Sequence, residues 1–188
     1  MKKISYNSPV VLTFTLISFG ALVLNYITGG VSNSLLFTVY RAPLTDPLFY
    51  LRLFTHVIGH ANISHFVGNF TMILLVGPML EEKYGSKVVL VTMVLTAFVT
   101  GLINVIFFTT GLLGASGIVF MMIIMCSFTN TENGKIPLTF ILVAVIYIGG
   151  EVIDGLLSAD NISQMAHIIG GICGGAAGHI FGVKKLKI

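Results

Sequence analysis

The stretch KVVLVTMVLTAFVTGLINVIFF, residues 87–108, carries a charge only at its first position and is dominated by aliphatic side chains. Such a run is long enough to cross the roughly 30 Å hydrocarbon core of a bilayer as an α-helix. The whole chain of 188 residues has the same character, with 55% hydrophobic and 9% charged residues. A soluble domain is about one-quarter charged. The composition therefore predicts a polytopic membrane protein and excludes a soluble enzyme, a nucleic-acid-binding protein and a disordered chain.

Six apolar segments predict an all-α fold with six transmembrane helices in a single domain, residues 1–188. Their approximate bounds are 10–27, 56–80, 87–108, 116–128, 136–153 and 162–183. Ser8 and Pro9 are typical of a helix cap and a first helical residue ahead of the first span. Residues 28–55 contain too many apolar side chains for a disordered linker. We expect them to form a partly inserted loop on the outer side.

The basic residues are distributed unequally between the two sides of the membrane. Six spans place both termini on one side, and eight of the ten Lys and Arg residues would lie there: Lys2, Lys3, Lys83, Lys87, Lys135, Lys184, Lys185 and Lys187. The opposite side has only Arg41 and Arg52. Because cytoplasmic loops carry the excess of Lys and Arg, we expect both termini in the cytoplasm.

Polar side chains inside the spans are costly in lipid and mark candidate functional positions. At about 1.5 Å of rise per residue, four of them fall in one slab on the outer side of the midplane: His65, Asn69, Ser116 and His167. On a continuous helix His60 would point roughly 140° away from His65, so we expect it to brace the outer loop. For the remaining polar residues of the spans we expect structural roles, as histidine donors for His56 and His179 and as an interhelical hydrogen bond for Asn104.

The fourth segment is too short to cross the bilayer, because residues 116–128 cover only about 20 Å as a helix. The loop of residues 109–115 must then dip into the membrane, which is tolerated only beside protein or water. Ser116 would lie at a helix N-terminus, where free N–H groups favour an oxyanion. His65 and Asn69 share one helix face and can donate hydrogen bonds to it. Taken alone, however, a serine at a helix start most often caps the helix.

A stripe of glycines in the sixth segment predicts close helix packing. Gly170, Gly174, Gly178 and Gly182 are each four residues apart, so they line one face that another helix can approach closely. His167 lies three residues before Gly170 and would be pressed against the same neighbour. If that neighbour is the fourth segment, His167 meets Ser116.

The motif Gly114-Ala115-Ser116-Gly117, together with Ala166-His167-Ile168-Ile169-Gly170 and Gly174, resembles the rhomboid family of intramembrane serine proteases. The spacing of His56, His60, His65 and Asn69 is similar to that of bacterial rhomboids. Arg52 within residues 51–56 resembles the family's Trp-Arg element, and residues 77–83 resemble its Glu-x-Arg element.

The resemblance implies a rhomboid-like fold and a catalytic dyad, with Ser116 as nucleophile and His167 as general base. His65, Asn69 and the Ser116 backbone N–H would form the oxyanion hole, and Phe120 would pack on the catalytic histidine. The implied supporting residues are His60, Phe120, Gly114, Gly117 and Gly170. Lys83, Leu51 and Phe120 depart from the family's usual Arg, Trp and Tyr.

The resemblance also implies the partners and the location of the protein. Its substrates would be transmembrane proteins that reach the site laterally from the lipid bilayer, past residues 136–153 and the outer loop. No metal or cofactor and no nucleic acid is implied. The expected location is a bacterial inner or plasma membrane, with the site opening to the outer face.

Three other functions remain open from the residues. A transporter or channel could use His65, Asn69 and His167 as a polar pathway, although the cytoplasmic halves of the spans are almost wholly apolar. A metal or haem protein could use His56 and His60, which are four residues apart. An inactive relative would only bind membrane helices, but the presence of both Ser116 and His167 argues against it.

Overall fold

The computed structural model describes residues 5–127 and 161–184, together with positions 138, 141, 142, 145, 146, 149 and 153. This part of the chain is almost entirely helical, which confirms the predicted all-α membrane fold. Its helices are α1 (Pro9–Ile27), the π-helix η1 (Asn33–Phe37), α2 (Pro47–Thr55), α3 (Ile63–Tyr84), α4 (Ser86–Phe107), α5 (Ser116–Cys126) and α7 (Asn161–Lys184). Among the described residues, α1, α3 and α4 are long and apolar enough to cross a membrane.

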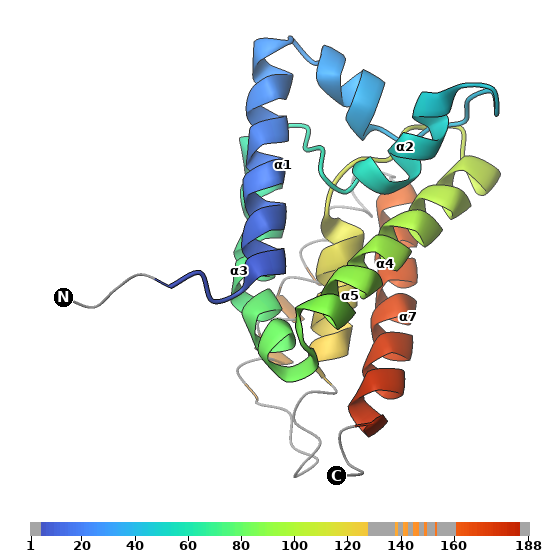
Figure 1. The fold of residues 1–188 in the computed structure, drawn as a ribbon. Coiled ribbons are helices and arrows are strands. Elements are labelled where there is room, and N and C mark those ends of the chain that lie inside the picture. The colour runs from blue at the N-terminus through green and yellow to red at the C-terminus, as the bar shows by residue number, and fades with distance from the viewer. Residues whose placement is uncertain are drawn as a thin grey trace.

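Four of the predicted spans correspond to helices with similar bounds. The segments 10–27, 87–108, 116–128 and 162–183 match α1, α4, α5 and α7. The predicted fifth span, residues 136–153, lies almost entirely outside the described residues. In Figure 1, α1 begins and α7 ends at the same end of the bundle, where the turn from α3 to α4 also lies.

The predicted second span was wrong at its N-terminal boundary. It was expected to begin at His56, but α2 ends at Thr55 and α3 begins only at Ile63. The cause is Asn62, whose backbone is extended and whose side chain accepts a hydrogen bond of 2.9 Å from the His65 N–H. This N-cap satisfies a free amide of the first turn and defines the helix start. His60 therefore lies in the connecting segment, and the 140° angle expected on a continuous helix does not apply.

Residues 28–55 contain two short helices, η1 and α2, where an outer loop was predicted. Arg52 joins them, although its side chain is only 1% exposed. Its guanidinium donates hydrogen bonds to the carbonyl oxygen of Leu35 (3.2 Å) and to Asp46 Oδ2 (2.6 Å), and it lies over the Tyr40 ring at 4.4 Å. A buried guanidinium is tolerated only with such partners. The contacts of Arg52 therefore hold residues 28–55 in one conformation.

A second buried charge holds the opposite end of the bundle. Glu81 of α3 accepts hydrogen bonds from the backbone N–H groups of Val10 and Val11, at 3.3 and 2.8 Å, and from the Ser86 hydroxyl at 2.7 Å. Ser8 occupies the N-cap position of α1, as predicted, but its side chain makes no capping bond. The carboxylate of a distant helix caps α1 in its place, because its charge favours the positive end of the helix dipole.

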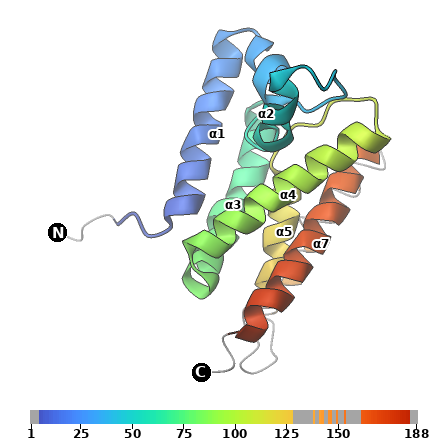
Figure 2. The same cartoon turned by 45° about the vertical axis from the view of Figure 1, so that its right-hand side comes forward.

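Helix α5 is the centre of the bundle, and nine of its eleven residues are buried. It lies between α3, α4 and α7 (Figure 2). Its closest neighbour is α7, and the reason is a lack of side chains at the contact. A Cβ on Gly170 would overlap the carbonyl oxygen of Gly117, and a Cβ on Gly174 would overlap that of Met121. The glycine stripe therefore brings the two backbones into direct contact.

We predict that Gly174→Ala destabilises the fold, because its methyl group would be forced against the α5 backbone. Overpacking of this kind lowers the free energy of unfolding by about 1–3 kcal/mol. The matched control is Gly175→Ala, whose Cβ would lie 3.8 Å from Ile124 Cγ2, an ordinary contact. The control should be neutral or slightly stabilising, since alanine favours the helix. Unfolding in mixed micelles measures both, and equal stability of the two variants would contradict the packing argument.

The pair of Asp46 and Arg52 predicts a pH-dependent contribution to stability. The hydrogen bond from Arg52 holds the pKa of Asp46 below its ordinary value. The pair therefore stabilises the fold above the unfolded-state pKa of about 4, and this contribution is lost as the pH falls through the lower folded-state pKa. Asp46→Asn preserves the cap on α2 but removes the charge.

We expect Asp46→Asn to unfold at a lower temperature than the wild type at pH 7. This difference in unfolding temperature should shrink as the pH falls below the folded-state pKa of Asp46. Glu82→Gln changes an exposed carboxylate on α3 and is the matched control, with little effect at either pH. A difference between Asp46→Asn and the wild type that does not change with pH would show that the charge pair contributes nothing.

Candidate active site

Ser116 is the first residue of α5 and is half-buried. The N-cap position belongs to Ala115, and no side chain caps this helix. The common capping role of a serine at a helix start is thus absent here. Gly114 has a φ of +122°, a conformation that is strained for residues with a side chain, and its N–H donates to the His56 carbonyl oxygen at 2.9 Å. The serine therefore follows a turn that is held by the protein backbone.

The ring of His65 lies directly against this turn. A Cβ on Gly114 would lie 2.7 Å from both Cε1 and Nε2 of His65, so only glycine leaves room for the imidazole. His65 belongs to the first turn of α3 and is half-buried. One of the two predicted oxyanion donors therefore lies against Gly114, two residues before Ser116.

Asn69 lies one turn further along α3, on the same face as His65. Its side chain is 3% exposed, and its Nδ2 donates to the His65 carbonyl oxygen at 3.1 Å. This bond orients the side-chain amide of Asn69 relative to His65. Asn69 and His65 therefore belong to one structural unit at the start of α3.

His167 of α7 is buried and stacks on Phe120 of α5, with ring centroids 4.1 Å apart and planes at 8°. Phe120 is four residues after Ser116, and residues at that spacing share a helix face. A Cβ on Gly117 would lie 3.3 Å from the carbonyl oxygen of Ala166, the residue before His167. The contact between α5 and α7 therefore brings the segment with Ser116 and the segment with His167 together.

His60 lies beside these residues but outside any helix. Its ring centroid is 5.0 Å from that of His65, and its Nδ1 lies 3.1 Å from the Ile58 carbonyl oxygen. Its own carbonyl oxygen accepts a hydrogen bond of 2.9 Å from Asn33 of η1. We call residues 28–55 the outer segment, after the side of the membrane predicted for them. His60 therefore connects the outer segment with the start of α3.

The loop of residues 109–115 is bound to the outer segment through its backbone. Leu112 and Val39 exchange two hydrogen bonds of 2.9 Å in an isolated β-bridge. Asn104 Nδ2 donates to the carbonyl oxygens of Val39 (3.3 Å) and Thr110 (3.1 Å). The predicted interhelical bond of Asn104 was therefore wrong, because its amide donates to carbonyl oxygens of the non-helical backbone instead.

His56 and a polar stripe on α4 support the site in a way that sequence reasoning missed. The two ring nitrogens of His56 lie 3.2 Å from the Arg52 carbonyl oxygen and from Thr100 Oγ1. Thr96, Thr100 and Asn104 are buried at intervals of four residues. That spacing was the available signal for the stripe, since it places all three on one face of α4. His56 in turn presents the carbonyl oxygen that holds Gly114.

Metal-binding clusters are absent from the part of the chain that the structure describes, where no group of three or more His, Cys, Asp or Glu residues could hold an ion. The contacts of His56 and His60 are instead with carbonyl, hydroxyl and aromatic groups.

Comparison with known families agrees with this arrangement. The family model of the rhomboid domain matches residues 48–184, which include α3, α4, α5 and every candidate site residue. No individual curated protein matches the chain. The match covers well over half of the sequence and runs through the helices whose contacts build the site. The chain belongs to the rhomboid family of membrane proteins.

Proposed function

We propose that this rhomboid is an intramembrane serine endopeptidase with Ser116 and His167 as its catalytic dyad. The observation that carries the proposal is the contact between α5 and α7, in which His167 stacks on Phe120, one turn after Ser116. A half-buried serine that does not cap its helix, one turn from the ring on which a buried histidine of another helix stacks, is compatible with a nucleophile and its base.

The reaction begins when His167 accepts the proton of the Ser116 hydroxyl and Oγ attacks the carbonyl carbon of the substrate. The carbonyl oxygen becomes an oxyanion, to which the Ser116 backbone N–H, His65 and Asn69 donate hydrogen bonds. His167 then transfers its proton to the amine that leaves. Water attacks the acyl-enzyme, again with His167 as the base, and the carboxylic acid product and free serine result.

The stacking on Phe120 supports a dyad without an acidic third member. In serine proteases with a triad, a buried aspartate holds the imidazole in its orientation. Here the face of Phe120, parallel to the imidazole at 4.1 Å, limits the rotation of the ring. The phenylalanine preserves the stacking face while lacking the hydroxyl of tyrosine.

The proposed substrates are membrane-spanning proteins that reach the site from the bilayer. A helical peptide bond is shielded by its own hydrogen bonds, so cleavage requires local unwinding, and small or helix-breaking residues favour it. Residues 136–153, past which we expect the substrate to enter, lie almost entirely outside the described residues. Because lysine is in excess at the end of the bundle where α1 begins, we also propose that both termini are cytoplasmic. The site would then open to the outer face of a bacterial plasma membrane.

Labelling with a fluorophosphonate tests the nucleophile without knowledge of the substrate, because this probe forms a covalent bond with an activated serine. We predict that the wild type is labelled and that Ser116→Ala is not. The matched control is Ser127→Ala at the C-terminal end of α5, whose hydroxyl donates to the Ile124 carbonyl oxygen at 2.6 Å. This control should be labelled as the wild type is.

Cleavage of a reporter transmembrane substrate gives the second readout for the same variants. Loss of the nucleophile should lower turnover by about 10³-fold or more. Equal labelling or equal cleavage by folded wild type and Ser116→Ala would refute the serine mechanism. A folded wild type that is neither labelled nor active would identify an inactive relative.

We further predict that Asn69→Ala lowers kcat for the reporter substrate by about 10²–10³-fold, the usual effect of removing one oxyanion donor. Substrate binding should change little, because the donor acts on charge that develops in the transition state. Thr71→Ala, an exposed position on α3, is the control and should retain full activity. An unchanged kcat in Asn69→Ala would remove this residue from the proposed oxyanion hole.

A further inference from the structure

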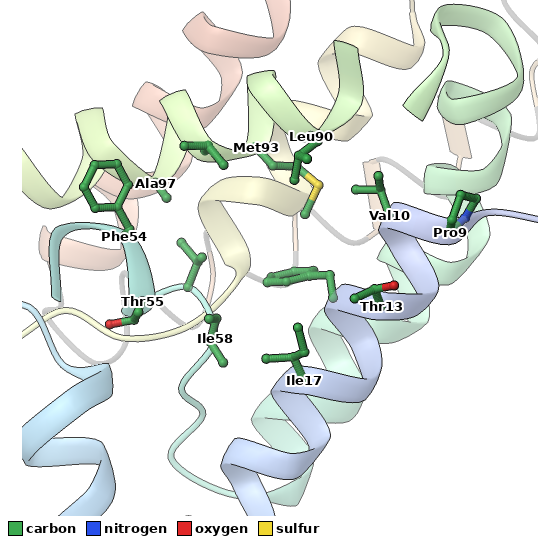
Figure 3. A pocket seen from close by; sticks show the side chains of 13 residues that line it. Pro9, Val10, Thr13, Ile17, Phe54, Thr55, Ile58, Leu90, Met93 and Ala97 are labelled. Atoms are coloured by element: carbon green, nitrogen blue, oxygen red, sulfur yellow. The ribbon is translucent and has the colours of Figure 1, made fainter. Parts of the chain in front are cut away.

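A pocket of about 500 Å³ lies between α1 and α4, away from the catalytic residues. Figure 3 shows side chains of α1, among them Val10 and Ile17, on one side and those of α4, among them Met93 and Ala97, on the other. Phe54 and the segment that follows α2 also line it. Both α1 and α4 are long and apolar enough to cross a membrane, and lining side chains such as Ile17, Phe54 and Val94 are exposed on the outside of the bundle, so the pocket opens toward hydrocarbon.

The lining of this pocket is suited to hydrocarbon and offers little to a polar ligand. Of the described residues that line it, Thr13 and Thr55 are the two with a hydroxyl. The Thr13 hydroxyl lies 3.0 Å from the Tyr6 hydroxyl, and that of Thr55 donates to backbone carbonyl oxygens of Leu36 and Leu51. Both hydroxyls are thus already paired, and a polar group placed here would lose its hydrogen bonds to water without replacement.

The pocket is short compared with a membrane-spanning helix. It extends along α1 from Pro9 to Ile17, which is about 12 Å at 1.5 Å per residue, whereas a transmembrane helix spans about 30 Å. The pocket therefore suits part of a flexible hydrocarbon chain better than the rigid helix of a substrate or of a second copy.

A basic residue lies beyond one end of the pocket. Lys87 is exposed in the first turn of α4, three residues before Leu90 and seven before Val94, both of which line the pocket. Residues at these spacings lie on one helix face. The same end of the bundle carries the start of α1, as Figure 1 shows. A phosphate group near Lys87 would therefore continue into a chain that lies along the pocket, and basic residues at the membrane surface attract anionic lipids.

We propose that this pocket binds one acyl chain of an anionic phospholipid, with the phosphate near Lys87. The chain would contact Phe54 and Ile58, which flank His56, the residue whose carbonyl oxygen holds Gly114. Bound lipid would thus pack against the segment that supports the candidate active site. An empty apolar pocket is unfavourable, and a lipid chain fills it without any need to pair polar groups.

The absence of tryptophan in the natural sequence allows a direct test. Phe54→Trp places a single fluorophore at the pocket, and Phe19→Trp places one on α1 outside it, at similar exposures of 42% and 48% for the native side chains. Each variant, in detergent micelles, is titrated with phosphatidylglycerol that carries bromine on its acyl chains and quenches tryptophan on contact. We expect half-maximal quenching of Phe54→Trp at a lipid mole fraction about fivefold or more below that of Phe19→Trp.

Two further pairs of variants test the position of the chain and of the phosphate. When Val94→Phe is added to Phe54→Trp, the larger side chain should fill the pocket and abolish quenching at low lipid mole fractions. Leu95→Phe, at the next position, which is exposed and does not line the pocket, should leave this quenching unchanged. Brominated phosphatidylcholine should require a higher mole fraction than phosphatidylglycerol, and Lys87→Gln should remove that difference. Ile17→Trp serves as the pocket reporter if Phe54→Trp does not fold.

Equal quenching curves for the pocket reporter and Phe19→Trp would overturn the proposal, as would early quenching that Val94→Phe leaves intact. Equal curves for the two lipids in the Lys87 protein would refute the anionic headgroup. None of these readouts depends on proteolysis, so the result stands apart from the proposed catalytic function.

Discussion

The direct contact between the backbones of α5 and α7 is the constraint on which the rest of the site depends. Gly170 and Gly174 have no side chains, so the carbonyl groups of Gly117 and Met121 lie where a Cβ would otherwise be. In lipid, helices gain nothing from hiding apolar surface, and close packing of this kind is what holds them together. The same approach sets the distance at which His167 meets the α5 face, and it explains the stacking of His167 on Phe120.

The other half of the site is held by hydrogen bonds of irregular backbone. The turn before α5 is bound at Gly114 by the His56 carbonyl oxygen and at Leu112 by Val39. Non-helical backbone within a membrane protein needs such partners because lipid offers none. The outer segment supplies them, which gives η1, α2 and the residues between them a structural purpose. The glycine at position 114 then leaves the space that the His65 ring occupies.

Two of the few charges of the chain, Glu81 and Arg52, organise helix ends. Glu81 binds the N-terminus of α1 and the hydroxyl of Ser86, while Arg52 binds η1 and the cap residue of α2. Both side chains are buried, and the hydrogen bonds that they make compensate for the loss of water. In a chain with only 9% charged residues, Glu81 connects α3 with residues 70 and 71 positions earlier, and Arg52 connects α2 with η1. The bundle is therefore anchored at its two ends by charge and in its middle by glycine.

The sequence by itself determined the membrane-helix composition, the bounds of α1, α4, α5 and α7, and the candidate residues, because hydrophobic runs and helical spacing are local properties. The start of the second span at Ile63 was missed although its cause is local, because the Asn62 side chain caps the first turn through a hydrogen bond from the His65 N–H, three residues on. Only the tertiary structure decided the partners of Asn104 and His56. Val39 and Thr100 lie 65 and 44 residues from them along the chain, and no local pattern encodes a contact between such distant residues.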